Sequence, residues 1–415
     1  MAEELVISRL GAAGDGAADG SGGPIYLPGT LPGERVLVER HGRDVRLLSR
    51  ETESPDRVEP FCAYYDRCGG CVAQHVGPDL YRSWKREKLV GALARVGLAP
   101  AVEPLLDAHG EGRRRVTFHA REIDREMQVG FMERGSHRLV AIERCPITEP
   151  GLAPASFAAT CLSQDLRSIR KPIDIAVLST PTGLDVDLRG SGPLDEARRQ
   201  RLIATAARLG LCRLSLHGEI LVEPRRPLVR MGRAQVTPPP GSFLQATQAG
   251  EDALAAAVLA GASRARRVAD LFAGCGPFTL RLADAAEVHA VDSDSNGLGA
   301  LDRAARAAGG LRRVTTEVRD LFRRPLLPPE LDRFDAVVLD PPRAGAEAQI
   351  RQLVLSSCET VIMASCDPGT FARDAAALAG GGYGVERVLP VDQFKWSAHL
   401  EMVGVFRRPK KPRRR

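Results

Sequence analysis

The sequence predicts an α/β protein whose C-terminal part is a doubly wound, Rossmann-like sheet of parallel strands. Residues 236–408 alternate short apolar runs, which suit buried strands, with runs that suit helices. The first of these strands ends in a glycine-rich turn, and an acidic residue follows each of the next three. Residues 1–55 instead predict a small OB-like β-barrel, and residues 56–235 predict a mixed α+β central domain.

The predicted barrel rests on β-rich runs at residues 5–7, 24–27 and 35–38, which glycine-rich turns separate. A barrel of this size commonly holds single-stranded RNA. A helix-like segment follows at residues 83–90. The turn at residues 238–241, with the sequence PPPG, marks the boundary to the C-terminal domain.

The C-terminal domain contains four apolar runs that predict buried parallel strands, at residues 267–272, 287–292, 334–339 and 360–364. Helices are predicted between them, at residues 278–286 and 298–308. In such a sheet, ligands bind at the carboxyl ends of the strands. The residues that follow each strand are therefore the candidates for a site.

The turn after the first strand contains Gly274 and Gly276, which allow the backbone to approach a cofactor closely. The third glycine of a dinucleotide fingerprint is missing, because its position holds Thr279. Asp292, which can bind a ribose hydroxyl pair, ends the run at 287–292, Asp320 follows a further strand before residue 334, and Asp340 follows the run at 334–339. This combination favours S-adenosylmethionine over a dinucleotide. The alternative is a plain turn in an enzyme that acts on small molecules.

A thiol and a carboxylate in the same domain indicate covalent catalysis. Cys366 lies just past the fourth strand, and Glu401 lies in an otherwise apolar, strand-like run. A pyrimidine C5 becomes nucleophilic when a thiolate adds at C6, and a base must then remove the C5 proton. We predict Cys366 as the nucleophile and Glu401 as the base. The alternatives are a small buried cysteine, an outward-facing strand residue, and an amine methyltransferase that uses the DPP run at 340–342.

A second group of cysteines consists of Cys62, Cys68 and Cys71, with Cys145 far downstream. Nine cysteines, an odd number, argue against a disulfide framework. Three thiolates within ten residues and a distant fourth, followed by a proline, can enclose an iron–sulfur cubane. We predict a structural [4Fe–4S] cluster, with zinc as the alternative.

The net charge of +6 depends on the C-terminal end of the chain. Residues 407–415 hold 7 of the 58 basic residues, and the remaining 51 face 52 acidic ones. The basic tail at 409–415 suits either a disordered solubilising end or a phosphate-binding segment. Three consecutive arginines at 113–115 also suit RNA phosphates, although a solvated strand edge is the alternative.

Taken together, these motifs resemble the bacterial RNA (uracil-5-)-methyltransferase family, and specifically its cluster-containing 23S ribosomal RNA branch. The resemblance covers essentially the whole chain. It implies a TRAM domain for the N-terminal barrel, a central domain with a metal cluster, and a class I methyltransferase domain at the C-terminus. It implies Cys366 as nucleophile and Glu401 as base. The implied cofactor contacts are Gln245, Phe272, Asp292, Asp320 and Asp340, and the implied cluster ligands are Cys62, Cys68, Cys71 and Cys145.

The chain departs from the family pattern at four places. Pro277 stands where an asparagine is common, Asp292 replaces a glutamate, and Asp367 replaces an asparagine. Residues 394–397, FKWS, replace a more usual Phe-Pro-x-Thr. These changes indicate a divergent subgroup, and they weaken any inference about which uridine is chosen.

We expect methylation of uridine C5 in RNA, with S-adenosylmethionine as methyl donor. Ribosomal RNA is the favoured partner, and transfer RNA is the alternative within the same reaction. A non-catalytic RNA-binding assembly factor is the rival from another class. The N-terminal residues do not resemble a signal peptide, and no apolar run reaches the roughly 20 residues that cross a membrane. We therefore expect a cytoplasmic monomer without a membrane partner.

Overall fold

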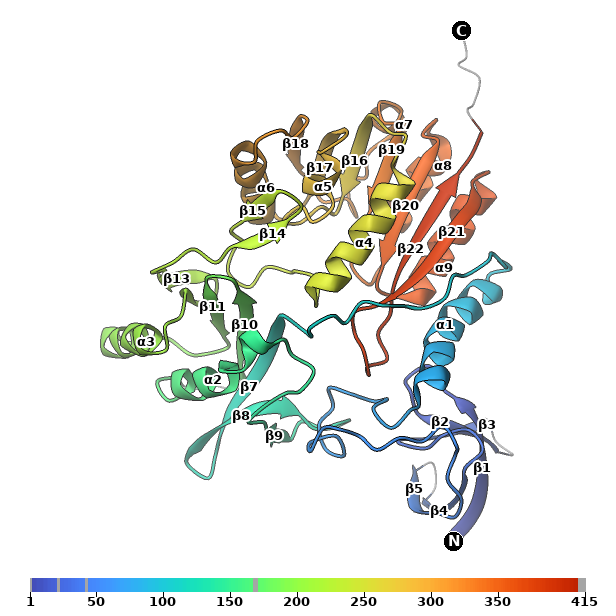
Figure 1. The fold of residues 1–415 in the computed structure, drawn as a ribbon, viewed down its shortest axis with the longest axis vertical. Coiled ribbons are helices and arrows are strands. Elements are labelled where there is room, and N and C mark those ends of the chain that lie inside the picture. The colour runs from blue at the N-terminus through green and yellow to red at the C-terminus, as the bar shows by residue number, and fades with distance from the viewer. Residues whose placement is uncertain (1, 21–22, 42–43, 167–170, 410–415) are drawn as a thin grey trace.

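The computed structural model describes residues 2–20, 23–41, 44–166 and 171–409, and three sheets dominate it (Figure 1). The N-terminal sheet, the central sheet and the C-terminal sheet follow one another along the chain. Of the predicted basic tail, residues 410–415 lie outside the described residues. No described helix is both long and apolar enough to cross a membrane.

The N-terminal sheet has five antiparallel strands in the order β3-β2-β1-β4-β5. Its strands are β1 (Ala2–Leu10), β2 (Gly16–Gly20), β3 (Gly23–Leu27), β4 (Arg35–His41) and β5 (Asp44–Arg50). The two edge strands, β3 and β5, contact each other, so the sheet curls toward a barrel around Ile7, Leu27, Val36 and Val38. A barrel-like N-terminal sheet is thus present, as predicted.

The central sheet has seven strands in the order β13-β12-β11-β10-β7-β8-β9. Its strands are β7 (Arg115–Ile123), β8 (Glu126–Met132), β9 (Leu139–Ala141), β10 (Ile173–Thr180), β11 (Gly183–Arg189), β12 (Arg213–Leu216) and β13 (Glu219–Val222). Every second side chain of β10 is buried, which is the period expected of a strand with one covered face. The short helix η1 (Pro150–Leu152) and helices α2 (Ala155–Ser163) and α3 (Glu196–Arg208) pack against this sheet.

The C-terminal sheet has eight strands in the order β18-β17-β16-β19-β20-β22-β21-β6. They are β6 (Leu106–Asp107), β16 (Arg267–Leu271), β17 (Glu287–Asp292), β18 (Val314–Val318), β19 (Ala336–Leu339), β20 (Thr360–Ser365), β21 (Gly384–Asp392) and β22 (Glu401–Arg407). All neighbours are parallel except β22, which runs antiparallel to both β20 and β21. The predicted strands and their order along the chain are confirmed.

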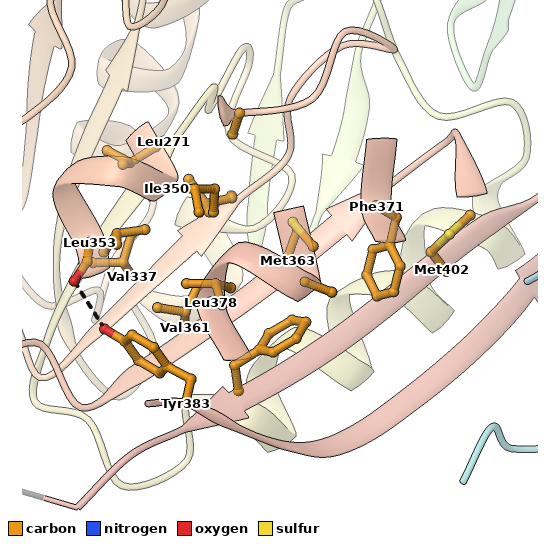
Figure 2. Packing of buried hydrophobic residues seen from close by; sticks show 14 of the residues in the cluster. Leu271, Val337, Ile350, Leu353, Val361, Met363, Phe371, Leu378, Tyr383 and Met402 are labelled. Carbon is orange, nitrogen blue, oxygen red and sulfur yellow. Dashed lines mark hydrogen bonds between the residues drawn. The ribbon is translucent and has the colours of Figure 1, made fainter. Parts of the chain in front are cut away.

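Helices cover both faces of this sheet: α1 (Pro78–Arg95), α4 (Gln248–Gly261), α5 (Thr279–Leu282), α6 (Ser295–Ala307), α7 (Pro328–Leu331), α8 (Glu347–Leu355) and α9 (Pro368–Gly380). Alternate side chains of β20 point to opposite faces, so Val361 and Met363 meet α8 and α9, whereas Ile362 meets α4. Figure 2 shows the first of these cores, where Phe371 packs near Met402. Truncating the buried Phe371 to alanine would cost about 3–5 kcal/mol.

The helix predicted at residues 278–286 is shorter than expected. Helix α5 ends at Leu282, because β17 begins only five residues later and the chain must turn to reach it. A small hairpin of β14 (Val229–Met231) and β15 (Ala234–Val236) packs on α6 and precedes the predicted boundary turn.

Helix α1 and strand β6 lie in the range predicted for the central domain, but they pack on the C-terminal sheet. The fully buried Lys85 of α1 forms an ion pair with Asp392 at 3.0 Å, and Tyr81 donates to the same carboxylate at 2.7 Å. Trp84 Nε1 donates to the Gly11 carbonyl, which connects α1 to the N-terminal sheet. The predicted domain boundaries at residues 55 and 235 therefore remain predictions.

Candidate active site

The loop after β16 has the backbone conformation that a close approach requires. Gly274 and Gly276 have φ values of 50° and 87°. A Cβ at Gly276 would lie 2.3 Å from Leu301 Cδ1, so only glycine fits there. Phe272 has φ 65° without being glycine, which is a strained conformation typical of functional sites. Its ring contacts that of Phe322, with 5.5 Å between centroids.

Two predicted acids lie at the carboxyl ends of neighbouring strands. Asp292 ends β17, and its carboxylate accepts from Gly274 N and Asp294 N, both at 2.8 Å. Asp320 follows β18 and accepts from Phe322 N at 3.0 Å. The carboxylates therefore shape the loops around them, and both oxygens of Asp292 and the Oδ2 of Asp320 keep a lone pair for a ligand hydroxyl. The glycine-rich loop, Asp292 and Asp320, which were all predicted to contact the cofactor, thus lie at the same edge of the sheet.

A third group of acidic side chains, Asp270 and Asp340, is buried beside this edge. Burial, with the nearby charges of Asp270 and Asp292, raises the pKa of Asp340 to about 7. Burial also raises the pKa of Asp270 to about 7, and its Oδ1 has no hydrogen-bond partner among the described residues. A cation bound here would relieve this repulsion, which fits the sulfonium of S-adenosylmethionine. Sequence reasoning missed Asp270, because it lies inside a strand rather than after one.

Cys366 follows β20 directly, just before α9. The register of β20 and β22 pairs Ser365 with Met402, which brings Cys366 opposite Glu401 at the end of the ladder. Burial, with the nearby Glu401 and Asp340, raises the pKa of Cys366 to about 11, and the Arg343 guanidinium opposes this. Cys366 is therefore a protonated thiol in the free protein, and it needs a proton acceptor to become a nucleophile.

Glu401 is the first residue of β22 and is only 3% exposed. Burial, with the Asp340 charge, raises the pKa of Glu401 to about 8, while a hydrogen bond from Gln393 and the charges of Arg343 and Arg115 act in the opposite direction. The structure thus brings together Cys366 and Asp340, which follow strands, and Glu401, which begins one. A carboxylate with this pKa can both accept and release a proton near neutral pH.

Gln245 lies in the segment before α4 and is buried. Its Oε1 accepts from Gln393 Nε2 at 2.6 Å, and Arg114 Nε donates to its carbonyl at 3.0 Å. Gln393, which also hydrogen-bonds Glu401, therefore connects Gln245 to Glu401. Sequence reasoning missed Gln393, because its partners are far away along the chain and no motif marks it.

The three arginines at 113–115 do not form one phosphate patch. Arg114 is buried and pairs with Glu251 at 2.5 Å, which is a structural role. Arg113 and Arg115 line a pocket of about 770 Å³ between the central sheet and the catalytic domain. Their Nε atoms are buried and have no partner among the described residues.

The four predicted cluster ligands line this same pocket: Cys62, Cys68, Cys71 and Cys145. All four thiols are free, and Cys62, Cys71 and Cys145 pack together around Tyr65 and Ile147. Burial raises the pKa of Cys71 to about 11, with smaller contributions from Cys145 and Cys68. Nevertheless, no three His, Cys, Asp or Glu side chains in the described ranges are arranged as a metal site. The structure thus gathers the donors without showing the predicted cluster.

The doubly wound sheet, its glycine-rich first turn and the acids at the strand ends define a class I S-adenosylmethionine-dependent methyltransferase. Residues 238–410 match the sequence model of a family described as tRNA (Uracil-5-)-methyltransferase. An uncharacterized RNA methyltransferase of Rhizobium meliloti (strain 1021) is 45% identical over 408 residues, which cover 97% of this chain and 98% of that protein.

The 23S rRNA (uracil(1939)-C(5))-methyltransferase RlmD of Chromohalobacter salexigens is 35% identical over 427 residues, covering 96% of this chain and 88% of that protein. The chain therefore belongs to the RNA (uracil-5-)-methyltransferase family. The crystal structure of Pyrococcus abyssi tRNA (uracil-54, C5)-methyltransferase in complex with S-adenosyl-L-homocysteine has the same fold, with a TM-score of 0.75. That similarity covers 97% of this chain and 99% of that one, at 21% identity.

Proposed function

We propose that this enzyme methylates uridine C5 in RNA through a covalent adduct with Cys366, giving 5-methyluridine. One observation carries the proposal: the register of β20 and β22 brings the Cys366 thiol opposite the buried Glu401 carboxylate, beside Asp340. An amine substrate would need neither group. A thiol and a base opposite each other suit a substrate whose carbon must first be activated.

In the proposed reaction, Cys366 releases its proton to solvent and its sulfur forms a bond to uracil C6, while the electrons of the C5–C6 double bond move toward O4 as an enolate and make C5 nucleophilic. Bound S-adenosylmethionine supplies the methyl group that C5 receives. Glu401 then takes the C5 proton, the C–H electrons restore the C5–C6 double bond, and the S–C6 bond breaks. Asp340 lies beside both Cys366 and Glu401, and in this scheme it orients the uracil base.

The residues that would hold the cofactor are those at the strand ends. Asp292 would bind the ribose, Phe272 would contact the adenine, and the backbone around Gly274 and Gly276 would approach the cofactor closely. Asp320 and Gln245 complete the proposed set. Support comes from the left-handed loop conformation and from the acidic side chains gathered at this edge.

The RNA that we favour is 23S ribosomal RNA, because a relative of that specificity aligns over most of both chains. Transfer RNA is the alternative, since the Pyrococcus abyssi enzyme with the same fold is a tRNA (uracil-54, C5)-methyltransferase. Such a substrate would place the protein in the cytoplasm, where we propose that it acts as a monomer. The test is methylation with labelled S-adenosylmethionine of both purified RNAs, followed by nucleoside analysis. Labelled 5-methyluridine in 23S RNA alone is expected, and a labelled N-methylated base would contradict the proposal.

We further propose that Cys62, Cys68, Cys71 and Cys145 hold a structural [4Fe–4S] cluster, with zinc as the alternative. Four free thiols line one pocket, where Arg113 and Arg134 provide compensating positive charge. Thiolates that raise one another's pKa suit a site that a metal group neutralises. Iron and sulfide analysis of anaerobically purified protein distinguishes the cluster from zinc.

A further inference from the structure

Gln74 lines the cysteine pocket and is only 3% exposed. Its Oε1 accepts from the backbone N–H of Cys62 at 3.2 Å. A backbone N–H can only donate, so this bond identifies the oxygen and directs the NH2 group to the other side of the amide. The Nε2 atom is buried too, and no acceptor among the described residues takes a hydrogen bond from it. The pocket therefore contains a buried donor that lacks an acceptor.

The thiol of Cys71 lies beside this donor. Burial raises the pKa of Cys71 to about 11, and the Gln74 side chain is the largest influence in the opposite direction. A donor lowers the pKa of a thiol because it stabilises the thiolate. The NH2 group of Gln74 thus faces the Cys71 sulfur, although the two do not have hydrogen-bond geometry.

Backbone N–H groups are directed at two of the other sulfur atoms. Gly70 N donates to Cys68 Sγ at 3.4 Å. Burial raises the pKa of Cys145, and a backbone hydrogen bond from Ile147 opposes this. A neutral S–H group is itself a donor and only a weak acceptor, so donors aimed at sulfur suit thiolates. Four thiolates around zinc or a [4Fe–4S] core form a negatively charged group that such donors stabilise.

The backbone on either side of Gln74 is held in place. Ala73 N donates to the Trp396 carbonyl at 3.1 Å. The His75 carbonyl accepts from Val58 N at 3.0 Å. The side chain of Gln74 therefore stays directed into the pocket.

We propose that Gln74 is a positioning residue of the metal site, whose NH2 group donates a hydrogen bond to the Cys71 sulfur when Cys71 is a metal-bound thiolate. The inference rests on the metal site given under the proposed function. A metal-bound thiolate supplies the acceptor that the buried NH2 group lacks, and an unpaired buried donor is costly. Zinc and an iron–sulfur cluster offer the same acceptor, and analysis for iron, sulfide and zinc distinguishes them.

Two variants separate the donor of Gln74 from its acceptor. Gln74→Leu removes both. Gln74→Glu keeps an oxygen for Cys62 N, but it places a second oxygen against Cys71, and pH 9 keeps this carboxyl group ionised. Gln349→Leu is the matched control, because Gln349 is a completely buried amide that bonds the Leu326 backbone at both ends and does not line the pocket.

The measurement is the rate at which anaerobically purified protein loses its metal to an excess of chelator at pH 9. We expect about tenfold faster loss in Gln74→Leu and still faster loss in Gln74→Glu, because the partners of metal ligands commonly change metal affinity by about 10–100-fold. Gln349→Leu should stay within twofold of wild type. If the metal is iron, the reduction potential should also become more negative in both Gln74 variants, since hydrogen bonds to sulfur favour the reduced cluster.

The opposite order of the two variants would overturn the inference. If Gln74 only holds the Cys62 backbone, Gln74→Glu retains metal as the wild-type protein does, and only Gln74→Leu loses it faster. Thermal melting checks folding, and if only one variant folds, a rate within twofold of wild type in that variant overturns the inference. The proposed metal site fails separately, because the wild-type protein would then contain neither zinc nor iron with sulfide.

Discussion

Two sets of thiols in this molecule have similarly raised pKa values for different reasons. Burial is the main cause at both Cys366 and Cys71, each with a pKa of about 11. Around Cys366 the further cause is carboxylates, and around Cys71 it is other thiols. In the proposed scheme, the first environment supplies a base for a thiol that must react, whereas the second supplies further ligands for a metal. The neighbours of a cysteine, rather than its pKa, indicate its role.

The two regions also differ in how they are built. Cys366 and Glu401 lie at the ends of paired strands, so the register of the sheet sets their separation. The cysteine-lined pocket consists largely of turns, and its shape depends on contacts with the central sheet and with the segment after β21. Backbone N–H groups of Val72 and Ala73 both donate to the Trp396 carbonyl, so the second region borders the segment between β21 and β22.

The largest effect is expected from replacing Cys366, the proposed nucleophile. Cys366→Ala should lower the methylation rate by about 10³-fold or more, because no other group can form the bond to C6. Binding of S-adenosylmethionine should stay within twofold, measured by calorimetry. Cys161→Ala is the matched control, because Cys161 is a free cysteine of α2 that does not line the pocket. A Cys366→Ala variant with the wild-type rate would remove the covalent scheme.

Glu401→Gln should lower kcat by about 10²–10⁴-fold, because an amide cannot take the C5 proton. The adduct with ordinary uridine RNA should then accumulate, since it forms but cannot eliminate. Denaturing gel electrophoresis would show it as a shifted band. Loss of both the product and the adduct would mean that Glu401 acts earlier, for example on the Cys366 proton.

Replacing a cysteine that lines the pocket should mainly lower the stability of the protein. Cys71→Ala should lower the free energy of unfolding by about 3 kcal/mol or more if a metal group is bound, because its binding energy contributes to folding. Denaturant unfolding and metal analysis are the measurements. Cys161→Ala should cost about 1 kcal/mol or less and keep the metal. Equal effects of the two variants would argue against a metal site.

The smallest effect concerns pH. Glu401 must be deprotonated to act as a base, and burial with the Asp340 charge raises its pKa to about 8, against Arg343 and Arg115. The value of kcat/KM should therefore rise with pH, by about tenfold between pH 7 and 9, as Glu401 loses its proton. A rate that falls over this interval would show that the protonated form is the active one.

Part of the candidate site could be placed from the sequence. Asp340 and Cys366 follow parallel strands, so the rule that such strands end at one edge places them together, whereas Glu401 begins the antiparallel strand β22 and comes to the same edge only through its pairing with β20. Gln393 could not be predicted, since its role depends on contacts with residues near position 245. The packing of α1 on the C-terminal sheet was also unpredictable, because it rests on the ion pair of Lys85 with Asp392, 307 residues away.

The same limit applies to the cysteines. Their spacing predicted that Cys62, Cys68, Cys71 and Cys145 share a site, and the pocket brings all four to one place. The spacing does not distinguish iron from zinc. That choice depends on sulfur positions and on the solvent and arginines around them, which are properties of the folded chain.

The most direct test of covalent uracil methylation uses RNA with 5-fluorouridine at the target position. Fluorine at C5 cannot leave as a proton, so the reaction should stop at an adduct that carries the RNA and the transferred methyl group. Intact-mass analysis after denaturation should find this adduct in the wild-type protein and none in Cys366→Ala. A wild-type protein that methylates the unmodified RNA but forms no adduct with the fluorinated one would contradict the account.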